Sequence, residues 1–145
     1  MGSEIFSPYL ITIFVAWLGS HVIKYVIDLT KNKKRKLRSH LFDSGGMPSS
    51  HSATAASLAT IIGLRDGFGS GLFGIAVIFA LIVMYDATKV RRSAGEQGIA
   101  ITEMIEKLKI NVNPPRIAKG HTPLEVAMGS ILGVIIGMVV FLATK

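Results

Sequence analysis

Two of the chain's four histidines stand in short polar motifs, each at the entrance to an apolar segment. His51 follows a proline and two serines, and His121 precedes Thr122 and Pro123. Serine or threonine caps and early prolines are typical of helix starts. A helix start presents unpaired N–H groups to a phosphate, and an imidazole can give or take a proton. Each motif could also be a capped helix whose histidine merely faces water.

The residues after His121 have a structural explanation of their own. Thr122 and Glu125 have the spacing of a capping box, with Pro123 at the first helical position. This pattern accounts for all three residues and leaves His121 unexplained. Candidate catalytic residues are therefore His121, His51 and Glu125.

Positive side chains that could hold a phosphate lie close to both motifs in the predicted topology. His21, Lys24 and Asp28 share one helix face within the first apolar segment. Polar groups at membrane depth usually face a bundle interior or a water-filled site. We expect Lys24 to serve the site, although it could snorkel to the interface. For His21 and Asp28 we expect structural roles.

A second source of positive charge follows the third apolar segment. Arg91 and Arg92 come five and six residues after Asp86, which lies inside that segment. An ion pair at the membrane edge would explain Asp86 structurally. Guanidinium groups suit bidentate phosphate binding. We therefore expect one or both arginines to bind an anion, and Asp86 to orient the arginines.

Composition indicates one integral membrane domain, residues 1–145. The chain has no cysteine, is half apolar, and carries a net charge of +7. Its apolar blocks predict four membrane spans, at about residues 9–29, 48–64, 72–90 and 123–143. Residues 95–110 have amphipathic spacing instead. We therefore predict an all-α four-helix membrane bundle with one amphipathic surface helix, lying on the membrane or on the bundle.

Glycines at positions 129, 133 and 137 form a close-packing stripe, either inside the bundle or in a homodimer. The basic residues lie beside spans, so we expect no nucleic-acid partner. We expect no cofactor; a metal site at His51, His121 and Glu125 is a weaker alternative.

Basic residues also predict the orientation of the chain. They concentrate at residues 31–38 and 89–119. Basic loops are retained on the cytoplasmic side, which places both histidine motifs there and both termini outside. The expected location is the bacterial cytoplasmic membrane or an organelle equivalent.

The motifs together resemble the type 2 phosphatidic acid phosphatase superfamily, which includes the vanadium haloperoxidases, and above all its small divergent branch. The resemblance rests on three stretches spread over nearly the whole chain: Gly45-Gly46-Met47-Pro48-Ser49-Ser50-His51-Ser52-Ala53, Met84-Tyr85-Asp86-Ala87 with Val90-Arg91-Arg92, and Gly120-His121-Thr122-Pro123-x-Glu125-Val126.

The resemblance implies a division of roles. His121 would attack phosphorus and form a phosphohistidine, Glu125 would orient it, and His51 would protonate the leaving oxygen. The implied phosphate-binding and supporting residues are Lys24, Arg91, Arg92, Ser49 and Ser50, with Asp86 and Gly120 in support.

The chain departs from the superfamily pattern in its cations and its size. Lys31 and Arg38 have the spacing of the superfamily's first motif, but Ser39 replaces the following proline, and Lys24 is the better candidate. Four residues rather than five separate Arg116 from His121, so Arg91 or Arg92 would take over its role. Four spans imply an abbreviated bundle, or one completed by a second subunit.

Two classes of function follow from these observations. The first is a membrane phosphatase that hydrolyses a lipid phosphate monoester or pyrophosphate from the cytoplasmic leaflet. The second is a non-catalytic protein that binds a phosphate headgroup in a retained pocket, or a small scaffold or carrier. An anionic phospholipid phosphate, such as an intermediate of phosphatidylglycerol synthesis, is the favoured substrate class.

Overall fold

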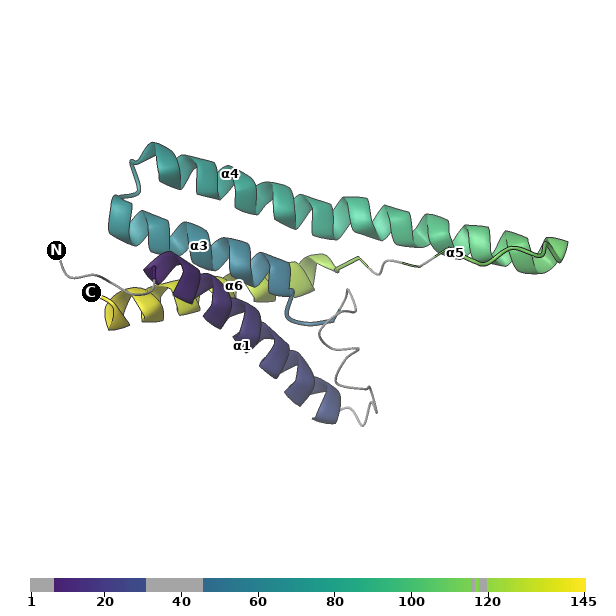
Figure 1. Ribbon diagram of the computed structural model, residues 1–145, viewed down its shortest axis with the longest axis horizontal. Helices are drawn as coiled ribbons and strands as arrows, with labels where there is room; N and C mark the ends of the chain where they lie inside the picture. Colours follow the sequence, from purple (N-terminus) through teal and green to yellow (C-terminus); the bar gives the residue numbers. More distant parts are fainter. Residues whose placement is uncertain (1–6, 31–45, 116, 118–119) are drawn as a thin grey trace.

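The computed structural model describes residues 7–30, 46–115, 117 and 120–145, and these residues form helices without strands. The expected all-α fold is confirmed. In chain order the helices are α1 (Pro8–Thr30), α3 (Ser50–Asp66), α4 (Gly71–Tyr85), a π-helical turn η1 (Asp86–Val90), α5 (Arg91–Leu108) and α6 (Pro123–Ala143) (Figure 1).

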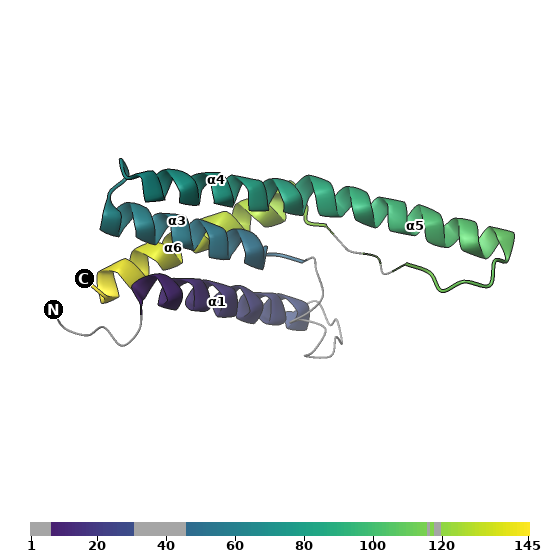
Figure 2. The ribbon, with the colours of Figure 1, turned by 45° about the horizontal axis from the view of Figure 1, so that its top comes forward.

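Helix α3 is the centre of the bundle. It packs against α1, α4 and α6, and α1 also packs against α6 (Figures 1 and 2). Its alanines and serines are largely buried, with Ala53 and Ser57 fully inaccessible. Small side chains allow the surrounding helices to approach closely. A helix enclosed in this way does not need an apolar surface, which explains its many hydroxyl groups.

Three helical segments are long and apolar enough to cross a membrane: Pro8–Thr30, Gly71–Leu108 and Pro123–Ala143. They cover three of the four predicted spans. The remaining predicted span corresponds to α3, which has 17 residues and begins at Ser50 rather than at residue 48. At about 1.5 Å per residue it is a little short for the hydrocarbon core.

The glycine stripe of α6 lies against α3, which selects the internal alternative. A Cβ at Gly129 or Gly133 would collide with the backbone carbonyl of Ser49 or Ala53, respectively. At Gly137 a Cβ would come within 2.7 Å of the Thr60 Cβ. Because this face is occupied within the chain, a homodimer, which stays a prediction, would need another surface.

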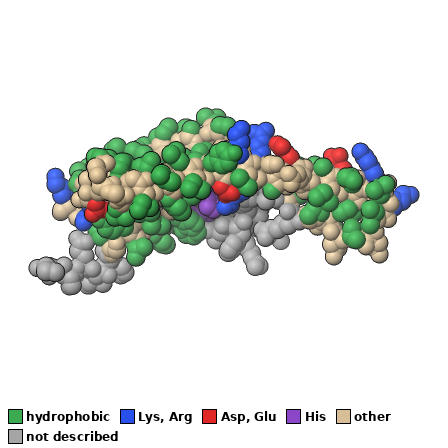
Figure 3. All heavy atoms as spheres, turned by 90° about the horizontal axis from the view of Figure 1, so that it is seen from above, with side chains coloured by type: hydrophobic (Ala, Val, Ile, Leu, Met, Phe, Trp, Pro, Cys, Tyr) green, Lys and Arg blue, Asp and Glu red, His purple; other side chains and the backbone are tan. Residues whose placement is uncertain are grey.

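The amphipathic helix is confirmed, but it is continuous with α4. The π turn η1 joins α4 to α5 without a break, and α5 projects beyond the other helices (Figures 1 and 2). Gly98 of α5 lies against Ile117, which belongs to the segment between α5 and α6. On the face of the molecule seen in Figure 3, hydrophobic side chains cover much of the bundle, whereas charged side chains lie at its two ends and along α5.

The arrangement brings four helix ends together. The starts of α3 and α6 lie at the same end of the bundle as the ends of α1 and α4, and the start of α1 and the end of α6 lie at the other end (Figure 1). Both histidine motifs therefore occupy one end, which we call the site end.

Candidate functional site

His121 and Glu125 form the best defined pair at the site end. Pro123 starts α6, and the expected capping box is present: the Thr122 hydroxyl accepts from the Glu125 N–H, and the Glu125 carboxylate accepts from the Thr122 N–H. The same carboxylate oxygen, Oε2, lies 3.0 Å from His121 Nδ1. A carboxylate can only accept at neutral pH, so Nδ1 carries a proton and Nε2 has a free lone pair in the neutral ring.

Burial also favours the neutral form of His121. The residue is only 2% exposed. Burial lowers the pKa of the His121 imidazole, and the charges of Lys24 and Arg91 lower it further, while the hydrogen bond and charge of Glu125 oppose this shift. A neutral, oriented imidazole is what nucleophilic attack requires.

The backbone of His121 is docked onto η1. The His121 N–H donates to the Ala87 carbonyl at 2.9 Å. Gly120 makes this approach possible, because a Cβ there would lie 2.5 Å from the backbone N and Cα of Arg92. The predicted supporting role of Gly120 thus has a concrete basis in close backbone contact.

The start of α3 is docked onto α6 in a similar way. The Ser49 N–H donates to the Glu125 carbonyl at 3.0 Å. Ser49 is the N-cap of α3, its side chain accepts from the Ser52 N–H and hydroxyl, and it is fully buried. Ser49, expected to contact phosphate, is therefore engaged as a helix cap. Ser50, also buried, occupies the first helical position.

His51 lies one residue further along α3 and is exposed. The charges of Arg91, His121, Lys24 and Asp86 all act on its imidazole. These charges come from α1, η1, α5 and the loop before α6, so four segments of the chain lie near His51.

Lys24 reaches this cluster from α1. Its side chain is buried, with 7% of the residue exposed, and the charges of Glu125 and Asp28 act on it. It does not snorkel to solvent. His21 faces inward too, but its Nδ1 lies 2.8 Å from the Trp17 carbonyl and its ring lies against the Trp17 ring. These contacts explain His21 structurally.

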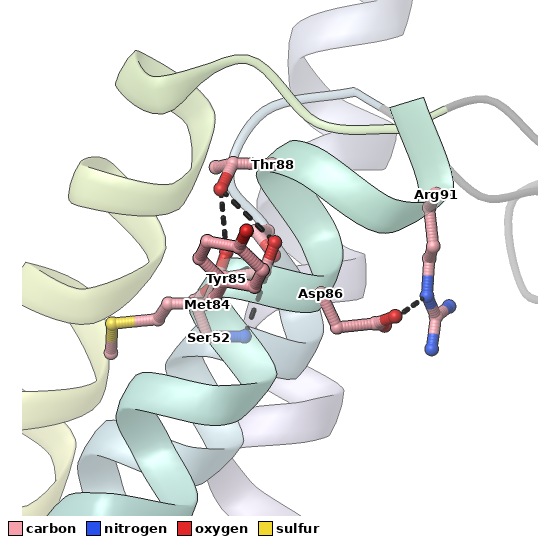
Figure 4. Close-up of polar contacts among 7 residues, drawn as sticks. Ser52, Met84, Tyr85, Asp86, Thr88 and Arg91 are labelled. Atoms are coloured by element: carbon pink, nitrogen blue, oxygen red, sulfur yellow. Dashed lines mark hydrogen bonds and ion pairs between the residues drawn. The ribbon is translucent and has the colours of Figure 1, made fainter. Parts of the chain in front are cut away.

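The two adjacent arginines point to different partners. Arg91 Nε lies 2.6 Å from Asp86 Oδ2 (Figure 4), and Arg91 acts on both histidines. Arg92 Nε lies 3.1 Å from Glu96 on the exposed side of α5, and both of these side chains are exposed. The structure therefore brings Arg91, and not Arg92, to the site.

Some predicted cations lie outside the described residues, namely Lys31, Arg38 and Arg116. Within the described part of the chain, no three His, Asp or Glu side chains are arranged to hold a metal ion. This finding gives no support to the metal alternative.

Sequence reasoning missed the π turn. Ala87 supplies a carbonyl to His121, and the Thr88 hydroxyl donates to the Met84 carbonyl at 2.9 Å beside it (Figure 4). Neither residue type carries a chemical signal. The one available hint was Gly120, since a glycine directly before a candidate nucleophile suggests close backbone approach.

Comparison with known proteins identifies the family of the chain. A profile described as the Divergent PAP2 family matches residues 6–136. The chain is 36% identical to an uncharacterized membrane protein, YuiD, of Bacillus subtilis (strain 168), over 90% of this chain and 91% of that protein. No solved structure matches the chain. With its apolar helices, this chain is a multi-pass integral membrane protein, and it belongs to the divergent PAP2 family.

Proposed function

We propose that this protein is a membrane phosphatase that hydrolyses a lipid phosphate through a phosphohistidine at His121. The observation that carries the proposal is the hydrogen bond between His121 Nδ1 and Glu125 Oε2. It fixes the ring and leaves Nε2 as the nucleophilic atom. The positive side chains around it suit a phosphate group.

The reaction would run in two balanced steps. In the first, His121 Nε2 forms a bond to phosphorus as the bond to the leaving oxygen breaks, and protonated His51 gives that oxygen its proton. In the second, neutral His51 takes a proton from water, the water oxygen attacks phosphorus, and the phosphorus–nitrogen bond breaks. Inorganic phosphate leaves, and both imidazoles return to their starting states.

The remaining site residues would hold the phosphate. Arg91 pairs with Asp86 through Nε, and its terminal nitrogens would donate to phosphate oxygens. Lys24 supplies a buried positive charge. Ser50 and the first N–H groups of α3 add hydrogen-bond donors at a helix N-terminus. We leave Arg92 and Ser49 out of the proposed phosphate contacts because each has another role.

We further propose that the site faces the cytoplasm, in a bacterial cytoplasmic membrane or its organelle equivalent. In the sequence, the basic residues at 31–38 directly follow α1 and those at 89–119 begin in η1, and such loops stay inside. This orientation favours an anionic phospholipid monoester over a polyprenyl pyrophosphate on the outer face. Single cysteines at Ser93 and Gly69 test it, because the native chain has none. In intact cells, an impermeant thiol reagent should label position 69 and spare position 93; the reverse pattern would contradict the proposal.

The proposed activity is tested by phosphate release in lipid nanodiscs. The substrates are phosphatidic acid, phosphatidylglycerol phosphate and a polyprenyl pyrophosphate, each offered to the native protein, His121→Ala and His21→Ala. Release should disappear in His121→Ala and persist in His21→Ala, the matched control. If the native protein binds these lipids without releasing phosphate, the non-catalytic alternative is correct.

A further inference from the structure

The π turn η1 changes which backbone groups are free at the site end. The Arg91 N–H donates to the Asp86 carbonyl, five residues back. In an α-helix it would donate to the Ala87 carbonyl, four residues back. The Ala87 carbonyl is thereby released from Arg91, and it accepts the His121 N–H at 2.9 Å.

The same turn sets the direction of Arg91. Residues five apart in an α-helix are rotated by about 140° relative to each other, so they face different sides. The wider π turn reduces this angle and lets the Asp86 carboxylate meet Arg91 Nε at 2.6 Å (Figure 4). One local widening of the helix thus serves both the arginine and the histidine loop.

Two neighbouring residues fit this widened turn. The Thr88 hydroxyl donates to the Met84 carbonyl at 2.9 Å and lies 3.3 Å from that of Tyr85. Gly120 lets the loop before His121 touch the Arg92 backbone without a Cβ in the way. A π turn amounts to one extra residue in a helix, and such turns are frequent at functional sites.

We infer that η1 is a positioning element that couples Arg91 to His121, so that phosphate binding and nucleophilic attack are aligned by one turn of backbone. This inference rests on the proposed function for the chemical roles of the two residues. The coupling itself concerns only this chain's geometry. It also suggests how the chain manages without an arginine at the superfamily's usual spacing before its histidine.

Deletion of Lys89 tests the inference by removing the extra residue. Lys89 is exposed, so its loss should restore α-helical pairing without opening the bundle core. The matched control is deletion of Ala100, an exposed residue of α5 ten residues after the end of η1. Deleting Lys89 should lower kcat about 100-fold, as expected for misplacement by about 1 Å, whereas deleting Ala100 should leave kcat within about twofold.

A second pair of variants tests the same inference if the Lys89 deletion does not fold. Gly120→Ala places a Cβ 2.5 Å from Arg92 backbone atoms, whereas Gly98→Ala meets only an ordinary 3.5 Å contact with Ile117. Gly120→Ala should lower kcat more than it raises KM, and Gly98→Ala should change neither. If the Lys89 deletion fails to fold by circular dichroism, this pair decides the question.

Nitrogen-15 NMR of the histidine side chains separates this inference from the proposed function. In the native protein, His121 should show the Nδ1–H tautomer that Glu125 imposes. Deletion of Lys89 or Gly120→Ala should move it toward the Nε2–H tautomer that a free imidazole prefers, while the His21 signal stays unchanged. An unchanged His121 tautomer and kcat in folded variants would overturn the coupling. If the native protein releases no phosphate, the proposed function fails and the tautomer result alone decides the coupling.

Discussion

The two ends of the bundle are held together by different kinds of hydrogen bond. At the end opposite the site end, side chains join the helices: the Tyr9 hydroxyl donates to Asp66 at 2.8 Å, and Arg65 donates to the Thr144 carbonyl and hydroxyl. At the site end, backbone groups join them, through Ser49 to Glu125 and His121 to Ala87. Because backbone groups make these hydrogen bonds, the side chains remain available to contact a ligand, which is what a binding or catalytic site requires.

Carboxylates at the two ends should therefore respond differently to amide substitution. Glu125→Gln replaces the carboxylate that fixes His121 with an amide, whose single neutral oxygen is a weaker acceptor, and we expect phosphate release to fall by about 100-fold or more. Asp66→Asn replaces the carboxylate that accepts from the Tyr9 hydroxyl with a weaker, neutral acceptor, and it should leave phosphate release unchanged while lowering the thermal midpoint slightly. Equal losses of activity in both variants would show that the contrast between the ends is wrong.

Within the site end, the two adjacent arginines should differ in their effect on phosphate release. Arg91→Lys loses the planar fork that can hold a phosphate oxygen and Asp86 together. A charge-assisted hydrogen bond contributes about 1.5–3 kcal/mol, so kcat/KM should fall roughly 10- to 100-fold. Arg92→Lys keeps a cation beside Glu96 and should stay near the native value. Steady-state kinetics of both variants decide this; a larger loss in Arg92→Lys would reverse our assignment.

A third comparison concerns stability rather than activity. Gly133→Ala pushes a Cβ against the Ala53 carbonyl at the centre of the bundle, and overpacking of this kind costs about 1–3 kcal/mol. Gly74→Ala, where nothing lies within 4 Å of the new Cβ, is the control and should be neutral or slightly stabilising. Thermal or denaturant unfolding in the same detergent measures both. Equal stabilities would mean that α3 and α6 are not packed as closely as described.

The smallest expected effect is on pH dependence. Burial holds the pKa of His121 below its ordinary value of 6.5, and the protonated ring cannot attack. As pH falls, kcat/KM should therefore decline only below about 6.5. Glu125 raises this pKa, so residual activity in Glu125→Gln should persist to still lower pH. A decline of kcat/KM that begins above pH 6.5, or one that moves to higher pH in Glu125→Gln, would contradict this account.

Much of the fold was predictable because its signals are local. The capping box at Thr122 and Glu125 places the start of α6 at Pro123, as found. Apolar length predicted the other spanning helices. The internal packing of Gly133 was one of two alternatives, and sequence alone could not choose between them because glycine stripes serve both uses.

The unpredicted features depend on single-residue geometry. A π turn adds one residue to a helix and leaves its apolar composition unchanged, so η1 and the continuity of α4 with α5 were not visible. Arg91 and Arg92 have the same chemistry but point about 100° apart on a helix. Only the partners of the two side chains in the structure, Asp86 for Arg91 and Glu96 for Arg92, show which arginine faces the histidines. Ser49 and Ser50 likewise differ only in which of them caps α3.

The most direct test of the central claim is to trap the phosphorylated enzyme. The native protein, His121→Ala and His21→Ala would be mixed with a ³²P-labelled lipid phosphate that the native protein hydrolyses, then quenched in alkali. We predict a protein-bound label on the native chain and on His21→Ala that is stable in alkali, lost in acid, and absent from His121→Ala. Phosphate release that persists in His121→Ala, or a label that maps to another residue, would contradict the account.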